Sequence, residues 1–159
     1  MTWFRKARPC TADVRGVRRD LAALFVIAHG GYRLGNMLFV TEPSAPALTV
    51  VDWQTVCLGP PGLDVAVFLA SSVDIETRRS MERYLIENYV DRLAQAGVRC
   101  SGYGLAWGSY RRASLSPLLL SVFTSVALER TERGDAMWLQ LLQGAAQLVT
   151  DAEAVRVLD

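Results

Sequence analysis

Asn36 and Asp52 stand on either side of two short apolar runs. Residues 29–36 read His-Gly-Gly-Tyr-Arg-Leu-Gly-Asn, and residues 51–54 read Val-Asp-Trp-Gln. Amide and carboxylate oxygens suit Mg²⁺, which usually takes one or two protein carboxylates and completes its shell with phosphates and water. Phosphoryl transfer needs such ligands together with an acidic base for the acceptor hydroxyl. The two ligands are present, and residues 29–36 contain no acidic side chain.

The segment between these two residues predicts a β-hairpin. Residues 37–40 and 48–51 are short apolar runs, and residues 41–47 (Thr-Glu-Pro-Ser-Ala-Pro-Ala) are rich in turn formers. A hairpin returns the chain on itself, so Asn36 and Asp52 are expected to face one space. The alternative is an asparagine in a turn and an aspartate that caps backbone amides.

Three motifs follow one another along the chain: His-Gly-x-Tyr-Arg-Leu-x-Asn-Met-Leu-Phe at residues 29–39, Val-Asp-Trp-Gln at 51–54, and Gly-Pro-Pro-Gly-Leu-Asp-Val-Ala-Val-Phe-Leu at 59–69. Together they resemble the catalytic region of the aminoglycoside phosphotransferase and choline-kinase-like superfamily. The resemblance is greatest to its bacterial phosphotransferase branch, some members of which are described as ecdysteroid-kinase-like, and it covers roughly residues 20–115. It implies ATP as the phosphoryl donor, Mg²⁺ as the metal and a hydroxyl-bearing small molecule as the acceptor.

The resemblance assigns roles within the loop. The family loop reads His-Gly-Asp, four further residues and Asn, so His29, Gly30 and Asn36 match it. Gly31 stands where the family has its catalytic Asp, so the base is lost. Gly35 also stands where this branch often has a second Asp. His29, the only histidine, is implied to be a structural residue of the loop.

Two acidic residues downstream match family positions. Asp52 falls on the metal-binding Asp, which implies that Asn36 and Asp52 would hold Mg²⁺. Asp64 opens a predicted buried helix at 63–70, where the resemblance implies that it braces the catalytic loop by hydrogen bonds. The residues alone leave a second role open, the capping of its own helix. A buried carboxylate must be hydrogen-bonded in either case.

The resemblance also implies a nucleotide-binding lobe before the loop, with a Gly-rich turn and a strand lysine. Such a lobe needs roughly 60–80 residues. Residues 1–28 contain no Gly-rich turn, and the only lysine, Lys6, lies in a basic stretch that ends at Pro9. Residues 11–24 instead predict an amphipathic helix. We therefore expect a C-terminal lobe without an N-terminal lobe, and weak or no binding of Mg-ATP by the isolated chain, because nothing would cover the phosphates or the adenine.

The remainder predicts helices. Asp74 is expected to cap a long helix that ends at Gly97. One face of this helix is apolar and is expected to be buried: Met81, Tyr84, Leu85, Tyr89 and Leu93. Residues 103–130 are expected to be helical, with Pro117 ending or kinking one segment, and a last helix is expected to open at Gly134. Residues 110–112 (Tyr-Arg-Arg) are either part of an acceptor site or plain helix surface.

Composition fits one domain over residues 1–159, divided into a catalytic-loop region at 25–70 and a helical subdomain at 71–159. The net charge of +1 offers no broad basic field for nucleic acid. No apolar stretch approaches the ~20 residues that span a membrane, and no signal peptide is evident. Three cysteines without metal-binding spacing indicate reduced thiols and a cytoplasmic location.

The expected fold is therefore mostly helical α+β, a protein-kinase-like C-terminal lobe with a small β-hairpin. Two functions remain open. The first is a truncated phosphotransferase-like protein without ATP-dependent transfer, whose apolar surface near Phe25, Phe39 and Trp53 forms a homodimer or binds a partner. The second is half of a split or longer ATP-dependent phosphotransferase, with its N-terminal lobe supplied separately.

Overall fold

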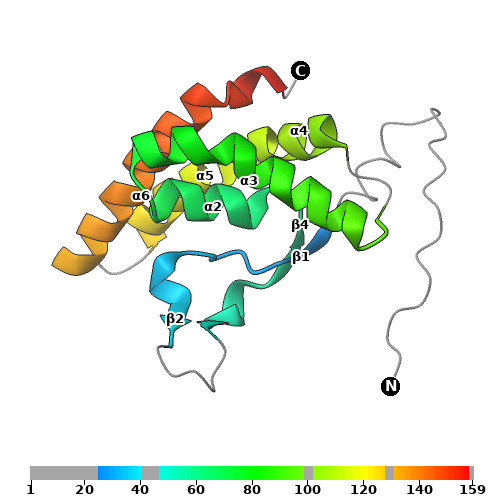
Figure 1. The fold of residues 1–159 in the computed structure, drawn as a ribbon. Coiled ribbons are helices and arrows are strands. Elements are labelled where there is room, and N and C mark those ends of the chain that lie inside the picture. Colours follow the sequence, from blue (N-terminus) through cyan, green and yellow to red (C-terminus); the bar gives the residue numbers. More distant parts are fainter. Residues whose placement is uncertain (1–24, 41–46, 99–101, 128–130, 158–159) are drawn as a thin grey trace.

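The computed structural model describes residues 25–40, 47–98, 102–127 and 131–157. Helices form a layer that lies above a long loop and two small strand pairs (Figure 1). The described helices are α2 (Leu63–Ser71), α3 (Ile75–Gln95), α4 (Tyr103–Ala113), α5 (Leu115–Ala127) and α6 (Glu132–Asp151). The mostly helical α+β prediction is confirmed. The helix expected at residues 11–24 lies outside the described residues.

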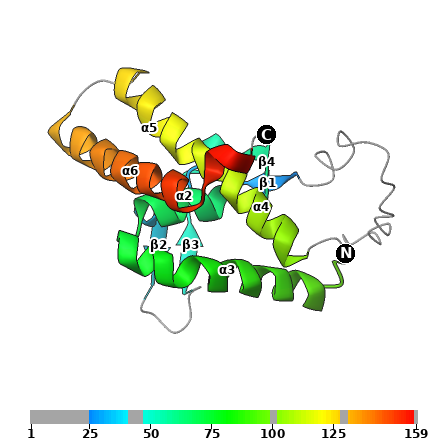
Figure 2. The same cartoon turned by 90° about the horizontal axis from the view of Figure 1, so that it is seen from above.

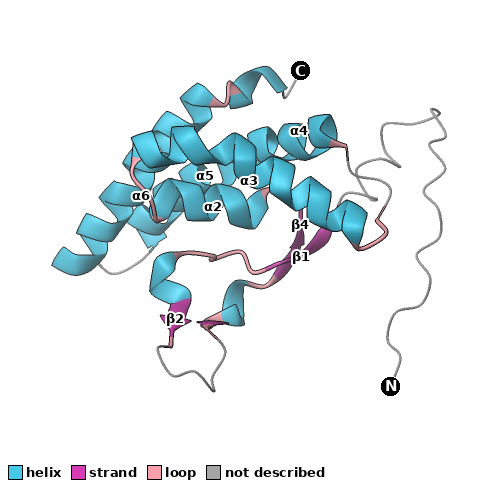
Figure 3. Ribbon diagram, in the orientation of Figure 1, coloured by secondary structure: helices cyan, strands magenta, loops and turns pink. Residues whose placement is uncertain are grey.

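The strands form two antiparallel pairs (Figure 3). Strands β2 (Met37–Phe39) and β3 (Leu48–Val50) pair with Met37 opposite Val50, so the predicted hairpin is confirmed. Strands β1 (Val26–Ala28) and β4 (Cys57–Gly59) form the second pair, which the sequence did not predict. Because β1 leads into the loop and β4 leads towards α2, this pair fixes both ends of the loop region.

Helix α2 is the centre of the core. It packs against α4, α5 and α6, and four of its residues are buried: Ala66, Val67, Leu69 and Ala70. Figure 2 shows α5 and α6 side by side across one end of this layer. A Cβ at Gly144 of α6 would overlap the carbonyl oxygen of Ala70, so glycine there allows the two helices to touch. The loop below α2 therefore rests on a closely packed layer.

The buried face of α3 differs from the prediction. The capping residue is Asp74, which accepts from the Thr77 backbone N–H at 2.9 Å, and Gly97 follows the helix with φ +81°. However, Met81 is 40% exposed and Tyr84 is 62% exposed. The fully buried positions on α3 are instead Arg78, Glu82 and Ile86.

A charged network explains this face. The guanidinium of Arg78, 1% exposed, donates to Glu82 at 2.8 Å and also to Asp151 of α6. The Tyr110 hydroxyl of α4 donates to Glu82 at 2.9 Å, and burial raises the pKa of Tyr110. Hydrogen bonds from Arg79 hold the pKa of Asp151 well below its usual range. Charged side chains thus join α3, α4 and α6, and an apolar pattern cannot reveal them.

The last three helices also correct the prediction. Pro117 is the third residue of α5, where its missing N–H costs nothing, and the break with α4 falls at Ser114. Helix α6 begins at Glu132, because the Thr131 side chain caps it by accepting from the Gly134 N–H at 3.0 Å. Within the described residues, no helix has both the length and the apolar character required to cross a bilayer.

Candidate functional site: a braced loop, two oxygen ligands and a cavity

The Asp64 carboxylate holds the start of the loop. Its Oδ2 accepts from the His29 backbone N–H at 2.8 Å, and its Oδ1 accepts from the Gly30 N–H at 2.9 Å. Asp64 lies in the first turn of α2, whose N-terminus carries no side-chain cap. A partial positive charge at the helix N-terminus stabilises a carboxylate in that turn. Both oxygens of Asp64 are therefore committed to the loop.

His29 is a buried structural residue of the loop. Its Nε2 lies 2.9 Å from the carbonyl oxygen of Val51, and its Nδ1 accepts from the Gly31 N–H at 3.2 Å. A carbonyl can only accept and an amide N–H can only donate, so the proton lies on Nε2. The Trp53 ring packs against the imidazole with a centroid distance of 4.7 Å. Neither ring nitrogen is left to exchange a proton with a substrate.

Glycine is required at position 30. Its φ is +80°, and a Cβ there would overlap the carbonyl oxygen of Thr55. The Thr55 hydroxyl in turn donates to the His29 carbonyl at 2.9 Å. The backbone angle and the close contact with Thr55 thus require glycine at position 30. Gly31 has no left-handed φ that would require glycine.

Asn36 and Asp52 line the same cavity. Asn36 is buried, and its Nδ2 donates to the Gly31 carbonyl at 2.8 Å, which leaves Oδ1 as its open acceptor. The Val51 N–H donates to the Asn36 carbonyl at 2.9 Å and so extends the hairpin pairing up to Asp52. Asp52 has left-handed backbone angles, φ 66° and ψ 55°, a conformation that clusters at functional sites.

This donor set fits Mg²⁺. The Asp52 carboxylate is exposed and forms no hydrogen bond with another described residue, so its oxygens are available to a cation. The described part of the chain contains no group of three or more His, Cys, Asp and Glu side chains that could hold a metal. Two protein oxygen ligands are enough for Mg²⁺, which completes its coordination shell with water and phosphate. They are too few for structural Zn²⁺, which takes four protein ligands.

A model of the ecdysteroid kinase-like family matches residues 7–101, a span that includes the loop, the hairpin, α2 and α3. The chain belongs to the ecdysteroid kinase-like family. No curated protein and no solved structure matches it. Membership makes the protein a relative of kinase-like phosphotransferases, which typically use ATP and Mg²⁺.

In this ecdysteroid kinase-like chain the cavity has a volume of about 730 Å³. The loop and the region after the hairpin form one side of it, and α5 and α6 form another. The wall from these helices is mostly apolar. Its apolar residues are Leu119, Leu120, Phe123, Trp138 and Leu141, and its polar residues are Ser116 and Thr124. Sequence reasoning missed this wall, although residues 115–127 contain no charged side chain, which is a visible signal of an apolar environment.

Residues 110–112 do not line this cavity. Tyr110 is fully buried in the charged network, and Arg111 donates to the carbonyl oxygens of Ala152 and Glu153. These two residues hold α4 against the end of α6 and do not contribute to this cavity.

Apolar side chains on β1 and β4 are exposed. Ile27 and Leu58 lie directly opposite each other in the pair and are 75% and 72% exposed. Phe25, two residues before Ile27, is 50% exposed. We call these three residues the β1–β4 apolar surface. Trp53 and Phe39, at 52% and 66%, are exposed as well.

The brace makes a direct prediction for stability. Asp64→Asn keeps one acceptor oxygen but turns an amide N–H₂ towards a backbone N–H, and it removes the charge. Hydrogen bonds to a charged group contribute about 1.5–3 kcal/mol, so we expect a loss of that size in the free energy of unfolding. Urea denaturation measures it.

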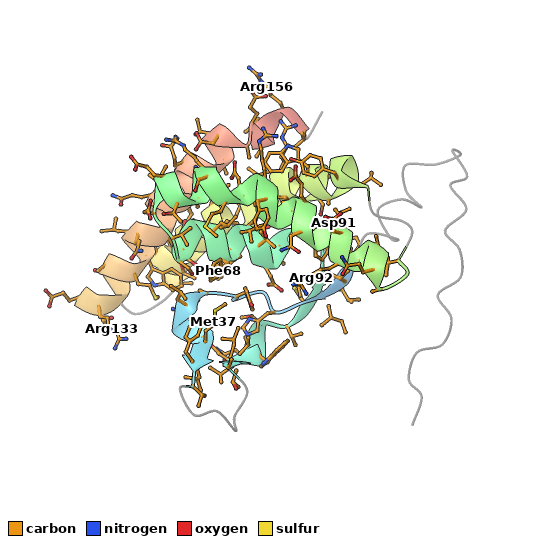
Figure 4. All side chains as sticks on the ribbon, in the orientation of Figure 1. Met37, Phe68, Asp91, Arg92, Arg133 and Arg156 are labelled. Carbon is orange, nitrogen blue, oxygen red and sulfur yellow. The ribbon has the colours of Figure 1, made fainter. Side chains whose placement is uncertain are left out.

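Asp91→Asn is the matched control, because Asp91 lies exposed on α3 (Figure 4). Its free energy of unfolding should change by less than about 0.5 kcal/mol. If Asp64→Asn were as neutral as Asp91→Asn, the brace would not stabilise the loop.

Proposed function

We propose that this protein is a small-molecule phosphotransferase relative in which Asn36 and Asp52 are the residues that would hold Mg²⁺, and that it does not transfer a phosphoryl group by itself. Membership of the ecdysteroid kinase-like family supports the kinase-like ancestry. The single observation that carries the loss of transfer is glycine at position 31.

Among the described residues, none of the side chains nearest to Gly31 replaces the proposed missing base. The three atoms nearest to the position of a Cβ there are Thr55 Oγ1 at 3.2 Å, Asn36 Nδ2 at 3.5 Å and His29 Nδ1 at 3.8 Å. The Thr55 hydroxyl already donates to a carbonyl, and the Asn36 amide nitrogen cannot accept a proton. The His29 imidazole nitrogen already accepts a hydrogen bond from the Gly31 N–H. None of the three can take a proton from an acceptor hydroxyl.

The metal ligands have a separate role. The Asn36 Oδ1 and the Asp52 carboxylate would hold Mg²⁺, which when bound neutralises charge on the phosphates of ATP. Asp52 is then committed to the metal and does not substitute for the base. A positioned base supplies about 10²–10⁴-fold in rate, or roughly 3–5 kcal/mol of barrier, so its loss is sufficient to suppress turnover.

The alternative proposal is that the chain is half of a split or longer phosphotransferase. In kinase-like enzymes an N-terminal lobe covers the nucleotide phosphates. The β1–β4 apolar surface supports a covering partner, because contiguous exposed apolar side chains usually mark an association site. That partner is a separately supplied N-terminal lobe or a second copy of this chain in a homodimer.

An acceptor-dependent phosphate-transfer assay tests the proposal on four proteins: the chain itself, Gly31→Asp, a fusion to an N-terminal lobe, and the fusion with Gly31→Asp. We expect turnover only from the last, because the base and the phosphate cover are independent requirements. A Cβ at position 31 would lie 3.2 Å from Thr55 Oγ1, so that hydroxyl must shift by a few tenths of an ångström, and it would lie in ordinary contact with Asn36 Nδ2 at 3.5 Å. Asp52→Asn in the combined protein should abolish turnover by removing the metal ligand.

Turnover by the unmodified chain would refute the loss of transfer. Turnover by the fusion without Gly31→Asp would support the split-enzyme alternative and show that this active site works without a base at position 31.

The β1–β4 apolar surface predicts self-association. Light scattering on the chain at high concentration should give the mass of a dimer, because pairing this surface removes apolar area from water. Ile27→Glu places a charge in the contact and should give a monomer. Val155→Glu, at an exposed position of η3 (Ala154–Val157), is the control and should leave the dimer intact. A monodisperse monomer at every concentration would exclude the homodimer.

A further inference from the structure

Arg33 is a cation in the cavity that neither the brace nor the metal site uses. It is half-buried, and its side chain lines the cavity. Its guanidinium Nη1 lies 3.3 Å from the thioether sulfur of Met137, which is a weak acceptor. Among the described residues it has no acidic partner. A guanidinium carries five N–H donors, so most of its hydrogen-bonding capacity is open to a ligand.

The uncharged polar groups around it mostly have partners. The hydroxyl of Ser71 donates to the Val67 carbonyl at 2.7 Å, and the hydroxyl of Thr124 donates to the Leu120 carbonyl at 2.7 Å. Thr55 and Asn36 likewise donate to loop carbonyls. The two charged groups in the lining, Arg33 and Asp52, therefore dominate polar recognition.

The wall from α5 and α6 favours an apolar ligand group, in contrast to the charged Arg33. It presents Leu119, Phe123 and Trp138 to the cavity. Leu119 and Phe123 are 68% and 69% exposed, so much of their apolar area is open to a ligand. Each Å² of such area removed from water contributes about 25 cal/mol. A ligand that covers this wall must be largely apolar.

We propose that this cavity binds an amphipathic anion, with a carboxylate or phosphate on Arg33 and an apolar body against α5 and α6. The planar guanidinium fork matches both anionic groups in two-point geometry. The volume of about 730 Å³ lies within the range of small-molecule sites. The site rests on binding alone and does not depend on phosphoryl transfer.

At its own position in the cavity, Arg33 favours an anion over a cation or a neutral molecule, while Asp52 carries the opposite charge. A cationic ligand would meet Arg33 as a like charge. A neutral alcohol would leave the guanidinium without a charged partner. When Asp52 holds Mg²⁺ its negative charge is compensated, and the cavity lining then carries a net positive charge.

Isothermal titration calorimetry with three octyl compounds tests this site: octanoate, octyl phosphate and 1-octanol, in EDTA to exclude metal. At least one anion should bind about 10–100-fold more tightly than 1-octanol, since hydrogen bonds to a charged group contribute a binding free energy that corresponds to this ratio of affinities. The tighter of the two anions identifies the preferred group.

Arg33→Gln should reduce the affinity for the anion to that for 1-octanol and leave 1-octanol unchanged. Arg133→Gln is the matched control, because Arg133 is exposed on α6 (Figure 4), is absent from the cavity lining and should keep the preference. Phe123→Ser should weaken binding of all three compounds.

Circular dichroism establishes that each variant is folded. Equal affinities of the unmodified chain for the anions and 1-octanol, or an unchanged preference in Arg33→Gln, would overturn the proposal. Failure of the transfer assay leaves it untouched, since no chemical step is involved.

Discussion

The two hydrogen bonds from the loop amides to Asp64 are the constraint on which the rest of the site depends. They fix the backbone of His29 and Gly30 against the first turn of α2. With its backbone fixed, His29 can place its Nε2 within 2.9 Å of the Val51 carbonyl oxygen. The residue next to Val51 is Asp52. A single carboxylate thus sets the position of the proposed metal ligand, which lies on another element.

The loop keeps its shape without a side chain at position 31. Gly31 takes part in the loop through its backbone alone. Its N–H donates to the His29 side chain, and its carbonyl accepts from the Asn36 side chain. An aspartate at this position would add chemistry but none of these hydrogen bonds. The loop scaffold therefore does not depend on a side chain at position 31, which is consistent with the proposed loss of the base there. Binding functions of the cavity, including that of Arg33, require only the scaffold.

Sequence patterns predicted the local structure well where residues close together in the chain determine it. Turn formers between two apolar runs gave the hairpin, and a capping aspartate and a terminal glycine bounded α3. The same hairpin geometry is why Asn36 and Asp52 line one cavity. These features depend on neighbours in sequence, which a single chain displays directly.

The remainder depends on contacts between distant residues. The pairing of β1 with β4 joins segments some thirty residues apart in the chain, and neither segment alternates clearly. The inward face of α3 contains Arg78 and Glu82, which are buried only because Asp151 and Tyr110 meet them there. The role of Arg33 becomes visible only when α5 and α6 supply the opposite wall of the cavity.

Amide hydrogen exchange, measured residue by residue by NMR, tests the brace most directly. The account predicts slow exchange of the His29 and Gly30 amides in the unmodified chain, because both are bonded to a carboxylate on the core helix. In Asp64→Asn these amides should exchange at least about tenfold faster than the drop in global stability explains, with Leu148 in α6 reporting that drop. Rapid exchange of His29 and Gly30 in the unmodified chain would contradict the account, because the loop would then not be held by Asp64.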